Sequence, residues 1–139
     1  YGITEKPDVA AIARRYQERR DAVLPLVGPR LDEMLKNFAM NHTFTSWFTE
    51  SASFAIWVRG LVVRTALLRF LVFAHPSVEA LQHGATPADA RTTIERVTVM
   101  MTARLDRAIE HNHPFLEMLD VSLPQAMPGL EHALCTLKI

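Results

Sequence analysis

The densest group of residues that could do chemistry lies in the stretch RAIEHNHPFLEML, residues 107–119. Arg107, Glu110 and His111 offer a cation that binds carboxylates and two groups that can transfer protons, as general acids and bases do. Residues three and four apart are neighbours on a helix, so Arg104, Arg107 and His111 share one face and Glu110 can pair with Arg107. The spacing predicts a polar helix face that could line a cleft.

The same stretch also has a purely structural interpretation, as the end of a helix. A protonated His111 in a last turn would meet the negative end of the helix dipole. Asn112 is a plausible C-terminal cap residue, and Pro114 cannot comfortably continue a helix. Helix termination therefore explains much of HNHP, and both interpretations stay open.

Other reactive arrangements are not indicated by the sequence. His111 and His113 are two residues apart and point to different faces, whereas a helical zinc pair needs a spacing of four. We predict no metal site in this chain. Cys135, three residues after His132, is typical of a small core thiol. The sequence contains no G-x-S-x-G nucleophile turn and no glycine-rich phosphate loop, so no complete catalytic motif and no cofactor pocket is visible.

Composition and charge narrow the class of protein. Of the 139 residues, 49% are apolar and 22% are charged, which is ordinary for one globular domain. Fifteen basic and fifteen acidic residues cancel, so nothing favours binding to nucleic acid or to an anionic membrane. The single cysteine excludes an internal disulfide and an all-cysteine cluster built from this chain alone. These features predict a cytoplasmic protein without a nucleic-acid partner.

The N-terminal sequence YGITEKPDV has neither the basic nor the apolar region of a signal peptide. This start is typical of a segment from the interior of a longer protein sequence. We therefore expect residues 1–139 to be a single helical domain that forms the C-terminal fragment of a longer protein.

Helical periodicity runs through the chain, and no period-2 alternation indicates a strand. The predicted fold is all-α: a compact bundle of about four main helices plus short C-terminal helices, with a buried central helix. The predicted main helices span about 7–24, 29–44, 50–74 and 87–112, and the short ones lie near 115–119 and 130–137.

Several residues set the predicted helix limits. Pro25, Gly28 and Pro29 predict a break between the first two helices. His75 and Pro76 end the third helix, and 77–85 is predicted to be a loop that could include one short turn. Thr86 suits the N-cap of the fourth helix, with Pro87 at its first position and Asp89 able to bond back.

The third predicted helix is the most apolar stretch of the chain. Residues 54–74 are long enough to cross a bilayer, but they include Arg59, Arg64 and Arg69. Steps of five residues turn each arginine about 140° from the last, so the three cannot share one polar stripe. A helix that is apolar nearly all round is a buried one. We therefore predict the central helix of a bundle and not a membrane span.

The order LDEMLKNFAMNHTF, then RTALLRFLVFAH, then a capped helix ending in RAIEHNHPFLEML resembles the C-terminal helical part of flagellin lysine-N-methylases. These bacterial proteins methylate lysine side chains of flagellin with S-adenosylmethionine. Asn37 and Phe38 stand where the family has an Asn-Tyr pair. The run of Glu110, His111 and Asn112 after Arg107 matches the family's arginine and acid-His-Asn run. The resemblance covers residues 30–120.

The resemblance implies a catalytic group of Arg107, Glu110 and His111, with Asn37, Arg104 and Asn112 binding substrate. Proton removal from the target lysine would fall to a carboxylate or a histidine. It also implies flagellin and a missing N-terminal part of the same protein as partners, and S-adenosylmethionine as cofactor. Family members carry a cysteine-rich module for an iron–sulfur cluster, and this chain contains none of those cysteines. Phe38 also lacks the family's aromatic hydroxyl.

Two alternatives belong to other functional classes. A bundle with a long apolar helix, six methionines and two tryptophans could enclose a small apolar ligand, as in the C-terminal half of a bacterial one-component repressor. An incompletely covered apolar helix could instead form a homodimer. Asn37 and Asn41 share a helix face and could bond across the core, cap a loop or simply be exposed.

Overall fold

The computed structural model describes residues 8–45 and 54–111, and these ranges contain helices and no strand. The helices, in chain order, are α1 (Val9–Thr45), α2 (Phe54–Ala74), α3 (Pro76–Glu79), the 3-10 helix η2 (Ala80–His83) and α4 (Pro87–His111). The predicted all-α class is confirmed. Asn112 and the short helices predicted near 115–119 and 130–137 lie outside the described residues.

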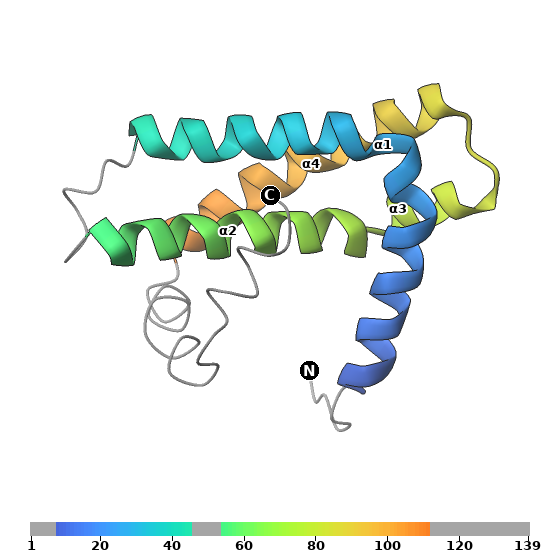
Figure 1. Cartoon of the computed structure of the whole chain (residues 1–139), viewed down its shortest axis with the longest axis horizontal. Coiled ribbons are helices and arrows are strands. Elements are labelled where there is room, and N and C mark those ends of the chain that lie inside the picture. The colour runs from blue at the N-terminus through green and yellow to red at the C-terminus, as the bar shows by residue number, and fades with distance from the viewer. Residues whose placement is uncertain (1–7, 46–53, 112–139) are drawn as a thin grey trace.

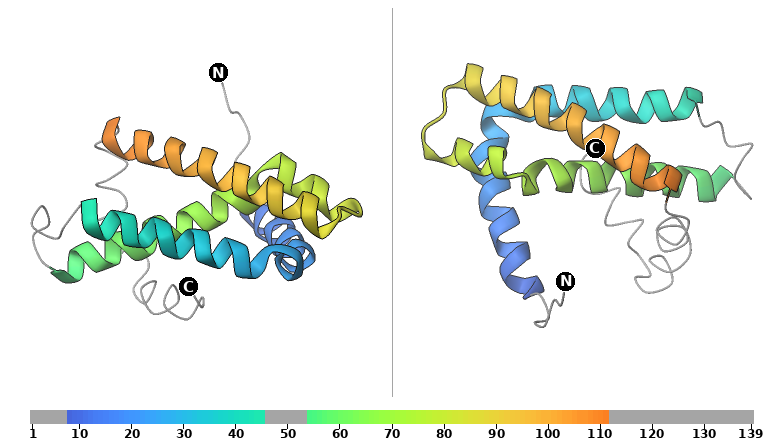
Figure 2. Two further views of the ribbon diagram at one scale, coloured as in Figure 1. Left: turned by 90° about the horizontal axis from the view of Figure 1, so that it is seen from above. Right: turned by 180° about the vertical axis from the view of Figure 1, so that it is seen from behind.

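Three long helices form the body of the fold, and each contacts the other two. The second part of α1 runs alongside α2, and α4 crosses behind both (Figure 1). The view from above shows α4 passing obliquely over the pair (Figure 2). The N-terminal part of α1 turns away and lies nearly crosswise to the rest, while α3 and η2 connect α2 to α4 at that end of the molecule (Figure 1).

The predicted break in the first helical region is wrong, because α1 continues as one helix from Val9 to Thr45. Pro25 and Pro29 lie inside it. A proline removes one helical hydrogen bond and crowds the preceding turn, which bends a helix without having to end it. Val23, Val27 and Leu31, on both sides of the prolines, are all fully buried, so packing holds the helix together across the bend.

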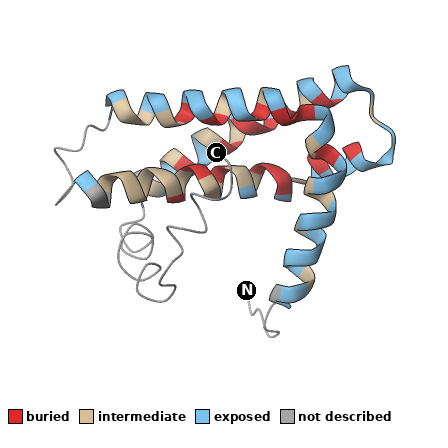
Figure 3. Cartoon of the chain, in the orientation of Figure 1, coloured by how far each residue is buried: buried red, intermediate tan, exposed pale blue. Residues whose placement is uncertain are grey.

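The hydrophobic core lies where the three long helices meet (Figure 3). It combines residues four apart on α1 with residues from the C-terminal half of α2 and with residues three or four apart on α4. Its main members are Val23, Val27, Leu31 and Leu35 of α1, Leu68, Val72 and Phe73 of α2, and Ile94, Val97, Met101 and Leu105 of α4. Ala108, three residues after Leu105, is exposed.

The apolar helix α2 forms one wall of this core. Its buried residues are Val63, Thr65, Leu68, Val72 and Phe73, and most of its other residues are half-buried (Figure 3). Within the described ranges, no single helix is long and apolar enough to cross a bilayer. The segments 57–74 and 76–83, bent by 61° relative to each other, meet that limit only when taken together.

The predicted end of the third helix and the predicted start of the fourth are confirmed. The predicted start of the third helix at 50 and the predicted end of the fourth at 112 lie outside the described residues. The stretch 77–85, predicted to be a loop, instead contains most of α3 and all of η2. α2 ends at Ala74, and His75 then caps α3, because its Nδ1 accepts a hydrogen bond from the Ser77 amide at 3.1 Å. At the start of α4, the Thr86 Oγ1 accepts from the Asp89 amide at 3.2 Å. The Thr86 hydroxyl also donates to the Asp89 carboxylate at 2.6 Å, so the acid bonds to the cap side chain.

Candidate ligand-binding groove

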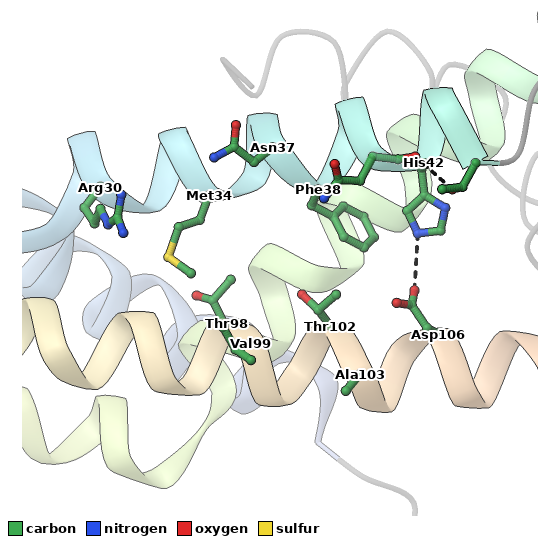
Figure 4. Close-up of a pocket in the computed structure, with 12 residues that line it drawn as sticks. Arg30, Met34, Asn37, Phe38, His42, Thr98, Val99, Thr102, Ala103 and Asp106 are labelled. Carbon is green, nitrogen blue, oxygen red and sulfur yellow. Dashed lines mark hydrogen bonds and ion pairs between the residues drawn. The ribbon is translucent and has the colours of Figure 1, made fainter.

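A groove of about 600 Å³ lies between the second part of α1 and the second half of α4 (Figure 4). Its wall on α1 is formed by Arg30, Met34, Asn37, Phe38, Asn41, His42 and Thr45, and its wall on α4 by Thr98, Val99, Thr102, Ala103 and Asp106.

The groove follows from the spacing of side chains on the two helices. Met34, Phe38 and His42 are four residues apart and therefore project from one face of α1. Small side chains face them from α4, including Thr98 and Thr102 (Figure 4). Because large residues on one helix meet small ones on the other, the two helices leave a space between them that side chains do not fill.

One end of the groove is closed by a histidine–aspartate pair. His42 Nε2 lies 3.2 Å from Asp106 Oδ1, across the gap between α1 and α4 (Figure 4). The His42 ring also meets the Phe38 ring edge-on, with centroids 4.5 Å apart. Its other nitrogen, Nδ1, is buried and has no hydrogen-bond partner. Neither nitrogen is therefore open to a ligand unless the ring moves, so the pair acts as a clasp between helices and not as a proton shuttle.

The α4 wall of the groove contains a second buried polar atom without a partner. Thr98 is 2% exposed, and its Oγ1 makes no hydrogen bond. Thr65 is equally buried, but its hydroxyl donates to the Leu61 carbonyl at 2.8 Å, as helical threonines commonly do. A buried polar group without a partner costs about 1–3 kcal/mol. The unused hydroxyl of Thr98 is thus available to a polar group that enters the groove.

The opposite end of the groove is electrically balanced. Arg30 donates from Nε to Glu95 and from a terminal nitrogen to Glu33, both at 2.7 Å. Arg91 donates to the same Glu95 oxygen at 3.2 Å. The hydrogen bonds from Arg91 and then Arg30 lower the pKa of Glu95, and those to Glu33 and Glu95 raise the pKa of Arg30. The positive charge of Arg30 is therefore balanced by Glu33 and Glu95. The negative charge of Asp106, at the other end of the groove, is less compensated.

The structure separates the residues that the sequence predicted as one site. Asn37 is exposed and lines the groove, whereas Arg104 and Arg107 are exposed on α4 and do not. Each residue of a helix advances by about 100° around the axis. Arg104, two residues after Thr102, therefore projects from nearly the opposite side of α4. Glu110 and His111 belong to the last turn of α4, but their side chains lie outside the described part of the structure. Asn112 lies wholly outside the described residues.

The clasp between His42 and Asp106 was not predicted from the sequence, where neither residue stands among the candidate site residues. The available signal was a pair of matching stripes: Met34, Phe38 and His42 on one helix, and Thr98, Thr102 and Asp106 on the other, each at steps of four. The sequence does not show which stripes face each other, because that depends on how the helices cross.

No group of three His, Cys, Asp or Glu side chains in the described part of the chain could hold a metal ion. Cys135 lies outside that part. Comparisons of the chain with protein-family models, with curated proteins and with solved structures found no match. Among the described residues, the groove is therefore the feature that points to a function.

Proposed function

We propose that this chain is a helical ligand-binding domain, and that the groove between α1 and α4 receives an elongated ligand with a protonated amine at one end. The observation that carries the proposal is that the buried Thr98 Oγ1, which has no partner, and the partly exposed Asp106 carboxylate belong to residues that line one space of about 600 Å³. Buried polar groups normally have partners, and exceptions often mark a site where a ligand or water binds.

The length of the ligand follows from the positions of the polar groups. Thr98 and Asp106 are eight residues apart on α4, which is about 12 Å at 1.5 Å per residue. Met34 and Phe38 face the stretch between them (Figure 4). A ligand that uses both ends therefore has an apolar middle, such as an alkyl chain.

The sign of the ligand's charge follows from Asp106. In the tautomer with its proton on Nε2, His42 donates to Asp106 and leaves the carboxylate's negative charge in place. The Asp106 side chain is 39% exposed, so an ammonium group can reach it from the groove. Asn41, one turn from Thr45 on the same wall, adds an amide oxygen as a further acceptor.

The proposal can be tested by calorimetric titration with hexylamine, with hexanol as the uncharged control. We expect hexylamine to bind and hexanol to bind at least tenfold more weakly, since the charge-assisted hydrogen bond is lost. Asp106→Asn should weaken hexylamine binding about tenfold. Asp32→Asn removes an exposed carboxylate of α1 outside the groove and should leave binding unchanged. Equal effects of the two substitutions would contradict the proposal.

A specific observation also favours lysine methylation as the wider activity. Asn37 and Phe38, which match the Asn-Tyr pair of flagellin lysine-N-methylases, both line the groove. A lysine side chain is an alkyl amine of the proposed kind. Under this second proposal, the groove holds a flagellin lysine, Asp106 accepts its proton, and the amine nitrogen takes the methyl group from the sulfonium of S-adenosylmethionine. The missing N-terminal part would supply the cofactor site and any iron–sulfur cluster.

Methylation of flagellin by the complete protein tests this second proposal and separates two possible sites. If the groove receives the lysine, Asp106→Asn should abolish the methyl gain measured by mass spectrometry, and Arg107→Ala should retain it. If the end of α4 is the site, as the sequence predicted, Arg107→Ala or His111→Ala should abolish it instead. Absence of methyl transfer by the unmodified protein would refute methylation and leave the binding proposal to the titration.

A further inference from the structure

A second hollow, of about 240 Å³, lies where the N-terminal part of α1 passes the C-terminal end of α2. Ile12, Arg15, Tyr16 and Arg19 line it from α1, and Phe70 and Ala74 line it from α2. It shares no lining residue with the groove between α1 and α4. What is inferred for the hollow therefore does not depend on the proposed ligand of the groove.

Arg19 is the fixed cation of this hollow. One terminal nitrogen donates to the carbonyl of Phe73 at 2.7 Å, and the other pairs with Glu79 at 2.7 Å. These contacts hold the guanidinium in place, and its side chain is only 11% exposed. The third nitrogen, Nε, is buried and has no hydrogen-bond partner. Arg19 thus presents one fixed N–H group that its structural role leaves unused.

Arg15 is the second cation, one helical turn before Arg19. It is exposed, and its hydrogen bond to the Ala11 carbonyl is long, at 3.5 Å. Within the part of the chain that the structure describes, no carboxylate pairs with Arg15. Glu79 pairs with Arg19 and Asp21 with Arg20, and Glu18, three residues after Arg15, is exposed and does not line the hollow. The region around the hollow consequently carries uncompensated positive charge.

Tyr16 lies between the two arginines in the sequence and adds both an aromatic wall and a donor. Its ring packs against Phe70 and Phe73, with centroid distances of 5.1 and 6.0 Å. Burial raises the pKa of Tyr16, against the opposing influence of Arg69 and Arg20, so the hydroxyl is protonated at neutral pH and can donate. Ile12 and Phe70 provide apolar surface beside it.

We propose that this hollow binds a small organic carboxylate, whose oxygens meet Arg15, the Nε of Arg19 and the Tyr16 hydroxyl while its apolar body packs on Ile12 and Phe70. Arginine suits this role because its planar guanidinium directs several N–H groups at a carboxylate. Glu79, the carboxylate closest to Arg19, is bonded to a different nitrogen of that guanidinium and leaves Nε to the ligand. An anion without an apolar part would contact the donors of the hollow but not its apolar residues, Ile12 and Phe70.

Titrations with three probes, followed by backbone amide chemical shifts, test this inference. Benzoate should bind with a dissociation constant on the order of millimolar, as expected for so small a ligand. Benzamide has the same ring without the charge, and inorganic phosphate has charge without the ring. Both should bind at least five times more weakly. Benzamide binding as tightly as benzoate would refute the role of the arginines, and phosphate binding as tightly would refute the role of the apolar wall.

A matched pair of substitutions locates the site without disturbing the structural contacts of Arg19. Arg15→Gln should weaken benzoate binding about five- to tenfold, which corresponds to the loss of one charged hydrogen bond. Arg14→Gln removes the neighbouring arginine, which is equally exposed and does not line the hollow, and should leave binding unchanged. Equal weakening by both, or benzoate binding unaffected by Arg15→Gln, would overturn the proposal, as would the absence of benzoate binding.

Discussion

At the scale of single residues, two buried threonines give a direct comparison of a satisfied and an unsatisfied hydroxyl. Thr98 and Thr65 are both 2% exposed, but only Thr65 makes a hydrogen bond. Thr98→Val should raise the free energy of unfolding by about 1 kcal/mol, because it removes an unpaired polar group. Thr65→Val should lower it by about 0.5–1 kcal/mol, because a bond is lost. Urea denaturation of both variants checks the difference in sign, and destabilisation by Thr98→Val would show that its hydroxyl has a partner.

Glu95 gives a residue-scale prediction of pH dependence. Arg91 and Arg30 lower its pKa in the folded chain, so the ionised form stabilises the fold. This contribution is complete above the ordinary pKa of a glutamate and disappears as the pH falls through the lowered folded value. Glu95→Gln should therefore be less stable than the unmodified protein at neutral pH, and the gap should close as the pH falls below the ordinary pKa of a glutamate. Urea denaturation across this range provides the measurement; a gap that widens in acid would contradict it.

At the scale of helices, the sequence signals that depend on residues a few positions apart predicted the helix ends correctly. The Thr86 cap and the stop at His75 depend on residues a few positions apart, and both are confirmed. The break expected at Pro25 and Pro29 failed because tertiary packing decides the outcome there. The apolar residues on both sides of the prolines are buried in one core, which keeps α1 helical through its bend.

Gly28 and Gly84, which lie in different backbone conformations, provide a test at this scale. Gly28 is helical, and a Cβ added to it would meet Leu24 at an ordinary distance of 3.6 Å. Gly28→Ala should change the free energy of unfolding by less than about 0.5 kcal/mol, because alanine's smaller loss of conformational freedom is opposed by crowding of its Cβ against the ring of Pro29. Gly84 ends η2 with φ of 99°, where a Cβ is strained, so Gly84→Ala should lower it by about 1–2 kcal/mol. Thermal denaturation should show a lower midpoint for Gly84→Ala and a nearly unchanged one for Gly28→Ala; a stabilised Gly84→Ala would contradict this assignment.

At the scale of the whole molecule, the described helices share one core and should unfold together. Leu31 is fully buried where α1 meets its neighbours, whereas Leu26, in the same helix, is 38% exposed. Leu31→Ala should cost about 2–5 kcal/mol, and Leu26→Ala, which creates no cavity, about 1 kcal/mol or less. Circular dichroism should show a single transition that shifts with Leu31→Ala. Loss of only part of the helical signal would indicate separate cores.

The candidate site was the least predictable feature, because it depends on how distant helices cross. Asn37 lines the groove, whereas Arg104 and Arg107, with which the sequence grouped it, do not. The structure instead places Asp106, on a different face of α4, opposite His42. Nothing in the spacing along a single helix distinguishes the face that meets a neighbour from the next polar face. Homodimer formation and the role of the α4 end stay predictions.

The most direct test of the account is to map hexylamine binding on the backbone amides of the chain by nuclear magnetic resonance. If the groove is the binding site, the largest shift changes should fall on two separate stretches, 34–42 of α1 and 98–106 of α4, and should disappear in Asp106→Asn. Changes concentrated at 107–111, or changes that persist in Asp106→Asn, would contradict the assignment of the groove as the ligand site.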